Sequence, residues 1–203
     1  MAIKVAKNIS GFTFLLGILL FGCKTDRSVI EGVPLTGFYD SCAEYYDFGQ
    51  MIKMGDPGDR FFISLPYSWD IREHYSDTLY GVFASNFMSI PIDTADRMSI
   101  VVSGYLTDEK LWNYYISELK QLKKDKKINV KETGSTEISG NDSFWIKFSQ
   151  QLADQKVYNL VVYLKKEYSD EIYLIQSTVY DTQEYDKKFC YLKQVISSFE
   201  IVE

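Results

Sequence analysis

The sequence predicts an α+β domain, an α/β/α sandwich whose central, mainly antiparallel sheet of six or seven strands is flanked by two main helices. Three strand patterns follow one another closely between residues 144 and 180, joined by short polar connections. Such connections favour an antiparallel meander, because parallel strands need crossovers of about a dozen residues or more. Two amphipathic helical patterns, one before and one after the meander, supply the outer layers.

The amino terminus has the pattern of an export signal. Lys4 and Lys7 make it positive, and the apolar run from Phe12 to Phe21 contains no acid. This run is too short to cross a bilayer, which takes about 20 residues, but it suits a signal core of about 7 to 15. We therefore divide the chain into a signal peptide (1–22), a leader that can hold one edge strand (23–58) and a folded domain (59–203).

The tetrapeptide Leu20-Phe21-Gly22-Cys23 resembles the lipobox of bacterial lipoproteins. The resemblance implies that the Cys23 sulfur carries a diacylglycerol, that the preceding peptide is removed and that the new amino terminus is acylated. Two or three acyl chains hold a protein stably on a membrane, whereas one binds only marginally. Lys24 replaces the aspartate typical of an enterobacterial inner-membrane retention signal, which favours the outer membrane over the inner membrane.

The charge balance argues against nucleic acid as a partner. Removal of residues 1–22, which hold two lysines and no acid, leaves 20 basic and 28 acidic residues and a formal charge of −8. A nucleic-acid-binding surface needs concentrated Lys and Arg. One basic cluster stands out at the end of a predicted helix: Lys120, Lys123, Lys124, Lys126 and Lys127. It can complement the helix dipole, or contact anionic lipid or an acidic partner.

Two cysteines remain besides the one in the lipobox. Cys42 lies in the leader and Cys190 in the last predicted helix, well off its apolar stripe, from where it could reach the leader. A disulfide can persist in the cell envelope. A bridge between Cys42 and Cys190 and two unrelated thiols both remain open.

A strong turn signal, Gly55-Asp56-Pro57-Gly58-Asp59, precedes the first strand. Its two aspartates suggest calcium binding, but the alternating ligand positions and terminal Glu of a calcium loop are missing. We therefore expect an ordinary turn.

The first clear strand is Phe61–Leu65, in which alternate apolar side chains share one face and Pro66 stops the ladder. The segment around His74 is interpreted as a polar loop. Further strands are expected at Thr78–Asn86, Met98–Tyr105, Ile128–Val130, Phe144–Gln150, Val157–Lys165 and Ile172–Tyr180.

Two helices are expected at the ends of the strand-rich region. Thr107 is a good N-cap for the first helix, with Asp108 and Glu109 in its first turn. Its apolar stripe comprises Leu111, Trp112, Tyr115, Ile116, Leu119 and Leu122. Asp181 and Glu184 are spaced like a capping box for the second helix. Its stripe comprises Tyr185, Phe189, Leu192, Ile196 and Phe199.

Several of these segments together resemble a known family. The stretch Phe62-Ile63-Ser64-Leu65-Pro66-Tyr67-Ser68-Trp69 resembles the strand, proline and tryptophan that open PsbP-like domains. The helix from Thr107, the Ile138-Ser139-Gly140 turn before Phe144-Trp145-Ile146, and the closing Ser197-Ser198-Phe199 follow in the expected order. Over roughly residues 59 to 200 the chain is similar to bacterial DcrB-like lipoproteins with a PsbP-like domain.

The resemblance implies an α/β/α sandwich with a central antiparallel sheet. The family includes the PsbP proteins of photosystem II and nuclear Ran-binding relatives, so it implies accessory binding in place of a shared reaction. The metal and Ran contacts of those members have no match in this sequence. Fold analogy supports a binding module by association only.

Catalytic signals are weak. His74 is the only histidine and has no cysteine or second histidine at a metal-ligand spacing, so a histidine-based metal site is excluded. A Ser-His-Asp arrangement stays open in space, but the chain lacks a Gly-x-Ser-x-Gly elbow. The paired acids Asp93 and Asp96, or Asp170 and Glu171, are typical of loops. With no Gly-rich phosphate loop either, we expect no catalytic residue, no cofactor and no metal.

Aromatic residues offer one binding hypothesis. Trp69, Tyr67 and the pair Tyr45-Tyr46 could form a platform for a sugar or a peptide. The favoured alternative for Trp69 is a core plug beside Pro66. For the two adjacent tyrosines both interpretations stay open.

These observations lead to one main functional hypothesis and two rivals. The main hypothesis is a membrane-anchored bacterial cell-envelope lipoprotein that acts as a non-catalytic accessory module and binds another envelope protein. The first rival is a small extracytoplasmic hydrolase that uses His74 and loop acids. The second rival is an immunity-type inhibitor of a secreted toxin.

Overall fold

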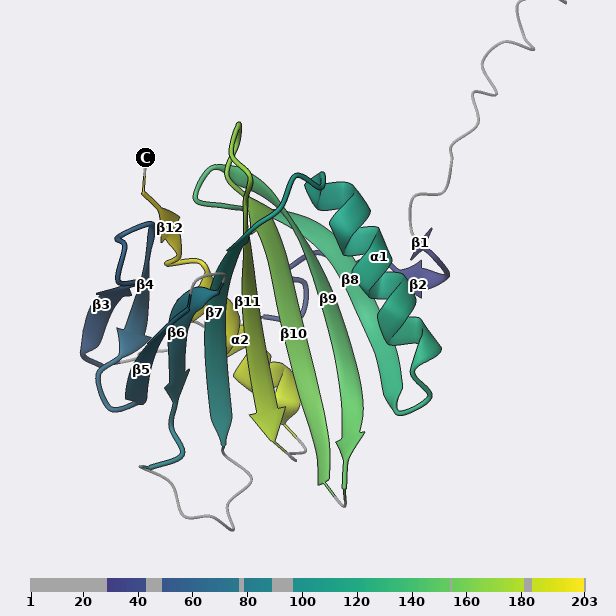
Figure 1. The fold of residues 1–203 in the computed structure, drawn as a ribbon. Helices are drawn as coiled ribbons and strands as arrows, with labels where there is room; N and C mark the ends of the chain where they lie inside the picture. Colours follow the sequence, from purple (N-terminus) through teal and green to yellow (C-terminus); the bar gives the residue numbers. More distant parts are fainter. Residues whose placement is uncertain are drawn as a thin grey trace, which may run out of the picture.

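A seven-stranded antiparallel sheet forms the middle layer of the protein (Figure 1). The computed structural model describes residues 29–42, 49–76, 79–88, 97–153, 155–180 and 184–202. The strand order is β5-β6-β7-β11-β10-β9-β8. The strands are β5 (Asp70–Tyr75), β6 (Tyr80–Ser85), β7 (Met98–Leu106), β8 (Ile128–Ile138), β9 (Asn141–Leu152), β10 (Gln155–Lys165) and β11 (Glu171–Tyr180). The predicted meander is confirmed, since β9, β10 and β11 are antiparallel neighbours.

Helix α1 (Leu111–Lys124) covers one face of the sheet, over β8, β9 and β10 (Figure 1). Tyr115 and Leu119 project from this helix and are fully buried against Ile146 and Tyr163. The recurrence of these residues every three or four positions is what predicted the helix, and burial of the stripe is what stabilises it.

The opposite face is covered by helix α2 (Tyr185–Ile196) and by a second, three-stranded sheet (Figure 1). This small sheet has the order β12-β4-β3, with β3 (Met51–Gly55), β4 (Phe61–Pro66) and β12 (Glu200–Ile201). Alternate residues of β4, Phe61, Ile63 and Leu65, are fully buried, as predicted for this strand. Together these elements confirm the predicted α+β sandwich with helices on both faces of a mainly antiparallel sheet.

Part of the predicted leader packs onto the domain. A short hairpin of β1 (Val29–Ile30) and β2 (Val33–Pro34) lies beside α1, and Leu35 forms a parallel bridge with Thr133 of edge strand β8. The chain then crosses to the α2 face, where Phe38 is buried. Cys42 and Cys190 are joined as a disulfide with their Cα atoms 5.3 Å apart. We call residues 35–42 the strap.

The strap lies over β8 where a side chain would not fit. A Cβ at Gly134 would collide with the Thr36 carbonyl oxygen and with the Trp145 ring. Because Gly134 has no side chain, the Thr36 backbone and the Trp145 ring can both approach β8 closely at this position. The sequence predicted only a short strand, Ile128–Val130, and β8 instead runs through Gly134 to Ile138.

The predicted starts of both helices are wrong. Helix α1 begins at Leu111, because Lys165 Nζ donates to the carbonyl oxygens of Thr107 and Glu109 and holds residues 107–110 outside the helix. Asp108 and Glu109 therefore precede the first turn. Glu184 is the N-cap of α2 but makes no capping hydrogen bond; its carboxylate pairs with Lys187 Nζ at 3.8 Å. Asp181 lies outside the described residues.

The polar segment around His74 is strand β5, which corrects its interpretation as a loop. It pairs with β6 from Asp70 to Tyr75 at the edge of the sheet, where charged side chains remain in solvent. Within the described ranges, none of the helices has the length and apolar character needed to span a membrane.

Candidate functional site

Three connections meet at one end of the large sheet. They are residues 107–110 before α1, the turn 139–140 between β8 and β9, and the hairpin loop 166–170 between β10 and β11. The Thr107 amide donates to the Asp170 carbonyl oxygen at 2.6 Å. Lys165 Nζ lies 3.0 Å from the Thr107 carbonyl oxygen and 2.9 Å from that of Glu109. These bonds fix the first connection against the third, and we call the resulting surface the loop end.

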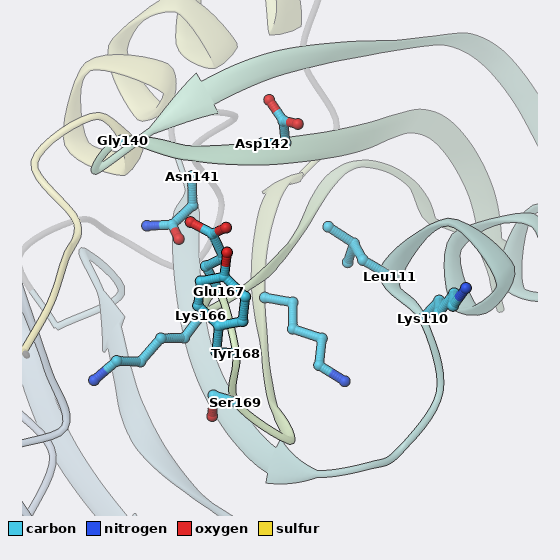
Figure 2. A pocket seen from close by; sticks show the side chains of 10 residues that line it. Lys110, Leu111, Gly140, Asn141, Asp142, Lys166, Glu167, Tyr168 and Ser169 are labelled. Atoms are coloured by element: carbon cyan, nitrogen blue, oxygen red, sulfur yellow. The ribbon is translucent and has the colours of Figure 1, made fainter.

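The loop end contains an open pocket of about 490 Å³ (Figure 2). Figure 2 shows side chains from all three connections lining this pocket. Its lining residues are Lys110, Leu111, Gly140, Asn141, Asp142, Lys165, Lys166, Glu167, Tyr168 and Ser169. Lys165 is already bound to backbone carbonyls, and Lys166 Nζ donates to the Val202 carbonyl oxygen at 2.7 Å. The pocket thus combines charges of both signs with few enclosed walls, which suits contact with a surface better than capture of a small ligand.

Three large side chains of the loop end are exposed: Tyr168, which lines the pocket, and Leu106 and Trp112, which flank the first connection and its pocket residue Leu111 in the chain. Tyr168 is 98% exposed, Leu106 is 73% exposed and Trp112 is 44% exposed. Leu106 lies opposite Glu171 at the start of β11, next to the hairpin loop. The Trp112 ring packs edge-on against Phe144, with the ring centroids 5.1 Å apart. Tyr168 also has a positive φ of 59°, a conformation that a bulky residue seldom adopts outside a turn or site.

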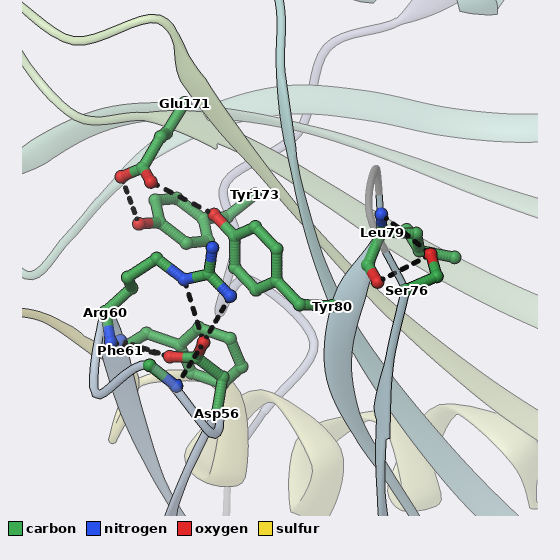
Figure 3. A network of polar contacts seen from close by, with 9 residues as sticks. Asp56, Arg60, Phe61, Ser76, Leu79, Tyr80, Glu171 and Tyr173 are labelled. Carbon is green, nitrogen blue, oxygen red and sulfur yellow. Dashed lines mark hydrogen bonds and ion pairs between the residues drawn. The ribbon is translucent and has the colours of Figure 1, made fainter.

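A polar network lies beneath this end, on the α2 face (Figure 3). Glu171 accepts hydrogen bonds from the Tyr173 hydroxyl at 2.8 Å and from the Tyr80 hydroxyl at 3.3 Å. The Arg60 guanidinium stacks over the Tyr80 ring, 3.0 Å from its centroid. Burial, together with the Glu171 charge, raises the pKa of Tyr80 to about 12, so this phenol stays protonated near neutral pH.

Asp56 organises the turn that carries Arg60. Its buried carboxylate accepts hydrogen bonds from the Gly58 amide at 3.0 Å, the Arg60 amide at 2.6 Å and Arg60 Nε at 2.8 Å. Burial acts to raise the pKa of Asp56, but these bonds and the Arg60 charge outweigh it and lower the pKa. The turn predicted at residues 55–59 is confirmed, and its carboxylate is occupied by donors of the turn itself.

Two buried lysines lie between α2 and the sheet. Lys147 Nζ pairs with Glu132 at 3.1 Å and with Asp186 at 2.5 Å. Lys193 is 2% exposed and lies over the Phe38 and Trp145 rings, 5.3 and 5.8 Å from their centroids. Burial, and then the Lys147 charge, lowers the pKa of Lys193 to about 8. The strap covers this amine through Phe38. Lys193 is therefore part of the packed interior, and a substrate cannot reach it.

The other residues singled out in the sequence do not converge on a catalytic site. His74 lies on β5 opposite Gly81 of β6, and its side chain makes no hydrogen bond or ion pair to the described residues. Glu171 is engaged by two tyrosines, and Asp170 contributes its carbonyl oxygen to Thr107. No three His, Cys, Asp or Glu residues of the described ranges lie close enough together to hold a metal. Cys23, Tyr45, Tyr46, Asp93 and Asp96 lie outside the described residues.

The proposed aromatic platform is not assembled by the described residues. Trp69 is buried in the core, and its ring stacks on that of Tyr191 in α2 with the ring centroids 6.2 Å apart. Trp69 is therefore a core plug. Tyr67 is exposed two residues earlier. The loop end could not be found from the sequence, because its members come from three connections that only the folded sheet brings together. The one local signal was Leu106, an apolar residue between a strand and a polar connection.

Comparison with solved structures identifies the fold. The Ran-binding protein Mog1p of Saccharomyces cerevisiae matches with a TM-score of 0.53 and 15% identity, over 76% of this chain and 96% of that chain. LpqN of Mycobacterium tuberculosis, which is involved in cell envelope biogenesis, has a TM-score of 0.53 and 13% identity, over 76% and 91% of the two chains. A cyanobacterial PsbP from Synechocystis sp. PCC 6803 has a TM-score of 0.49 and 13% identity, over 75% and 92%.

At these identities the likeness to Mog1p and LpqN shows a shared fold alone. By sequence, no protein-family model and no curated protein matches the chain. The fold is the α+β sandwich of Mog1p and LpqN, and function has to be argued from the chain's own surfaces.

Proposed function

We propose that this chain is a bacterial cell-envelope lipoprotein whose domain is a non-catalytic binding module. Acyl chains on Cys23 anchor it, in the outer membrane by preference, and the loop end docks onto another envelope protein. The observation that carries the proposal is the exposure of three side chains at the loop end: Tyr168, which lines the pocket, Leu106, which precedes the first connection, and Trp112, which follows the pocket residue Leu111. Clustered exposed apolar and aromatic side chains with a polar surround are typical of protein interaction sites.

Two further observations support this proposal. The disulfide between Cys42 and Cys190 suits an oxidising compartment outside the cytoplasm. Mog1p and LpqN, which share the fold, are described as Ran-binding and as involved in cell envelope biogenesis, which agrees with binding and with the envelope.

The docking surface is tested by site-specific photocrosslinking in cells. A benzoyl-phenylalanine at position 168 should capture one dominant envelope protein, whereas the same group at exposed Tyr67 should not. Leu106→Ser should reduce the capture at position 168, and Met88→Ser, which changes an exposed side chain elsewhere, should leave it unchanged. No specific product at position 168 in correctly localised protein would overturn the docking proposal.

The anchor is tested separately. Cys23→Ser should abolish metabolic labelling with a fatty-acid analogue and release the mature protein from membranes or trap its precursor. Unchanged labelling and fractionation would contradict lipidation and leave the docking surface to be judged on its own result.

A further inference from the structure

Five lysines gather at the carboxyl end of α1 and just beyond it. Lys120, Lys123, Lys124, Lys126 and Lys127 are all exposed. Asp125 lies between Lys124 and Lys126 in the chain, and Glu31 contacts this surface from the β1–β2 hairpin. Lys120 pairs with the Glu31 carboxylate at 3.6 Å, and Lys123 Nζ donates to the Glu31 carbonyl oxygen. No ion pair to a described residue engages Lys124, Lys126 or Lys127. We call the five lysines the basic end.

The helix dipole does not account for this concentration. A dipole favours cations within the last turn of a helix, which here contains Lys123 and Lys124. Lys126 and Lys127 lie beyond the C-cap, Asp125. Lys120 is four residues before Lys124 on the same helical face, a spacing at which like charges repel. The fold therefore carries more positive charge here than the helix requires, in a chain that is acidic overall.

The basic end lies where the leader joins the domain. The β1–β2 hairpin packs beside α1 (Figure 1), and both of its contacts with lysines are made by Glu31. Val29, the first described residue, is six positions after Cys23 in the sequence. A fully extended chain spans at most about 3.6 Å per residue, so this segment reaches roughly 20 Å. A lipid on Cys23 therefore keeps the basic end close to the bilayer surface.

An exposed apolar side chain lies beside these lysines. The Gln151 amide donates to the Lys127 carbonyl oxygen at 3.2 Å, which places the end of β9 next to the basic end. Leu152 follows and is 47% exposed, and Lys156 at the start of β10 is exposed too. Lysines around an exposed leucine are the combination that binds at the headgroup region of a membrane.

We propose that the basic end is a second membrane contact, which binds anionic phospholipid headgroups and orients the tethered domain with the acidic remainder of its surface away from the bilayer. This inference rests on the proposed lipid anchor. Tethering makes the contact intramolecular, so even a weak electrostatic attraction is effective. Added salt should weaken the contact, because dissolved ions screen the attraction over a Debye length of about 8 Å at physiological ionic strength.

Amine footprinting of the lipidated full chain tests the proposal. The protein is reconstituted in vesicles of phosphatidylcholine, or of an equal mixture of phosphatidylcholine and phosphatidylglycerol, neither of which has a reactive amine. Acetylation of each lysine is then followed by mass spectrometry. Lys120, Lys123, Lys124, Lys126 and Lys127 should react roughly five- to tenfold more slowly on the anionic vesicles. Lys53 and Lys187, elsewhere on the domain, should react equally on both.

A charge-matched pair of variants sharpens the result. In the triple variant Lys124→Gln, Lys126→Gln, Lys127→Gln the protection of Lys120 and Lys123 should disappear. The control triple variant Lys53→Gln, Arg72→Gln, Lys187→Gln changes the net charge equally, and should keep the protection. Salt at about 1 M, where the Debye length is about 3 Å, should also remove the protection in the unaltered protein.

The other outcomes are distinct. Equal labelling of the basic end on both vesicle types overturns the proposal while leaving the lipid anchor intact. Protection in native envelopes that protease treatment abolishes, without protection on anionic vesicles, assigns the surface to an acidic protein and also overturns it. If Cys23 carries no lipid, the mature chain with Cys23→Ser is footprinted with the same vesicles, and protection there retains the contact without the anchor.

Discussion

The two faces of the large sheet are built in different ways. Helix α1 covers its face with one continuous segment, and the core there consists of aromatic and aliphatic residues around Tyr115 and Leu119. The α2 face is closed by segments that are distant in sequence: α2, the small sheet and the strap. That face also holds the buried ionic groups Asp56, Lys147 and Lys193. We therefore expect the stability of the protein, and the pH dependence of that stability, to respond more to changes on the α2 face.

The largest expected effect comes from a pair of tryptophans on opposite faces. Trp145→Ala removes a fully buried ring that contacts Phe38 and Lys193, and should cost about 3–5 kcal/mol of unfolding free energy. Trp112→Ala on the α1 face, where the ring is 44% exposed, should cost about 1 kcal/mol. Urea unfolding measures both changes in unfolding free energy, and equal losses would contradict the proposed difference between the two faces.

The disulfide should give the next effect. Cys42→Ser with Cys190→Ser opens a link between residues separated by 148 positions, and should lower the unfolding free energy by about 2–4 kcal/mol. Reductant should destabilise the unaltered protein by the same amount and have no effect on the double variant. A reductant effect that persists in the double variant would show that the bridge is not its source.

Asp56→Asn should cost about 2 kcal/mol at neutral pH, because it removes the charge that binds Arg60 and the turn amides. The native pKa of Asp56 is lowered, so its contribution is present above the unfolded carboxyl pKa of about 4 and is lost as the pH falls through the native pKa. The variant should therefore lose less stability than the unaltered protein on acidification. Parallel acid-unfolding curves would contradict this role.

Lys193→Met should have a smaller effect of opposite sign, a gain of about 1–2 kcal/mol at pH 7. The native amine has a pKa of about 8 whereas the unfolded amine titrates near 10.5, so the unfolded state binds more protons between these values. Stability contributed by this group accordingly rises with pH from about 8 to 10.5. The methionine variant should lack this rise in urea titrations at several pH values, and Lys187→Met, at an exposed position, should retain it.

Several elements follow from local patterns that no tertiary contact overrides. The alternation of Phe61, Ile63 and Leu65 predicts β4, because a strand with one buried face requires that period. The apolar stripe with Tyr115 and Leu119 predicts the body of α1 for the equivalent helical reason. Short polar connections predict the meander, since they leave no room for a crossover.

Element boundaries depend on distant partners. Thr107 has the chemistry of an N-cap, yet Lys165 bonds the carbonyls around it and delays the helix to Leu111. The segment around His74 is polar enough to resemble a loop, but β6 supplies a hydrogen-bonding neighbour and makes it edge strand β5. Lys165 lies 58 residues after Thr107, and β6 is the next strand in the chain; the periodicity and propensity of a segment report neither contact.

The fold class, the meander and the amphipathic helices could be predicted from the sequence alone, which also contains a lysine cluster and a tetrapeptide that resembles a lipobox. Those features are local, because each depends on neighbours within a few residues. Three arrangements appear only in the folded chain: the strap passes β8 and joins Cys42 to Cys190, three connections form the loop end, and the lysine cluster lies beside the β1–β2 hairpin. These juxtapositions arise when packing and strand pairing bring together segments that the chain itself keeps far apart.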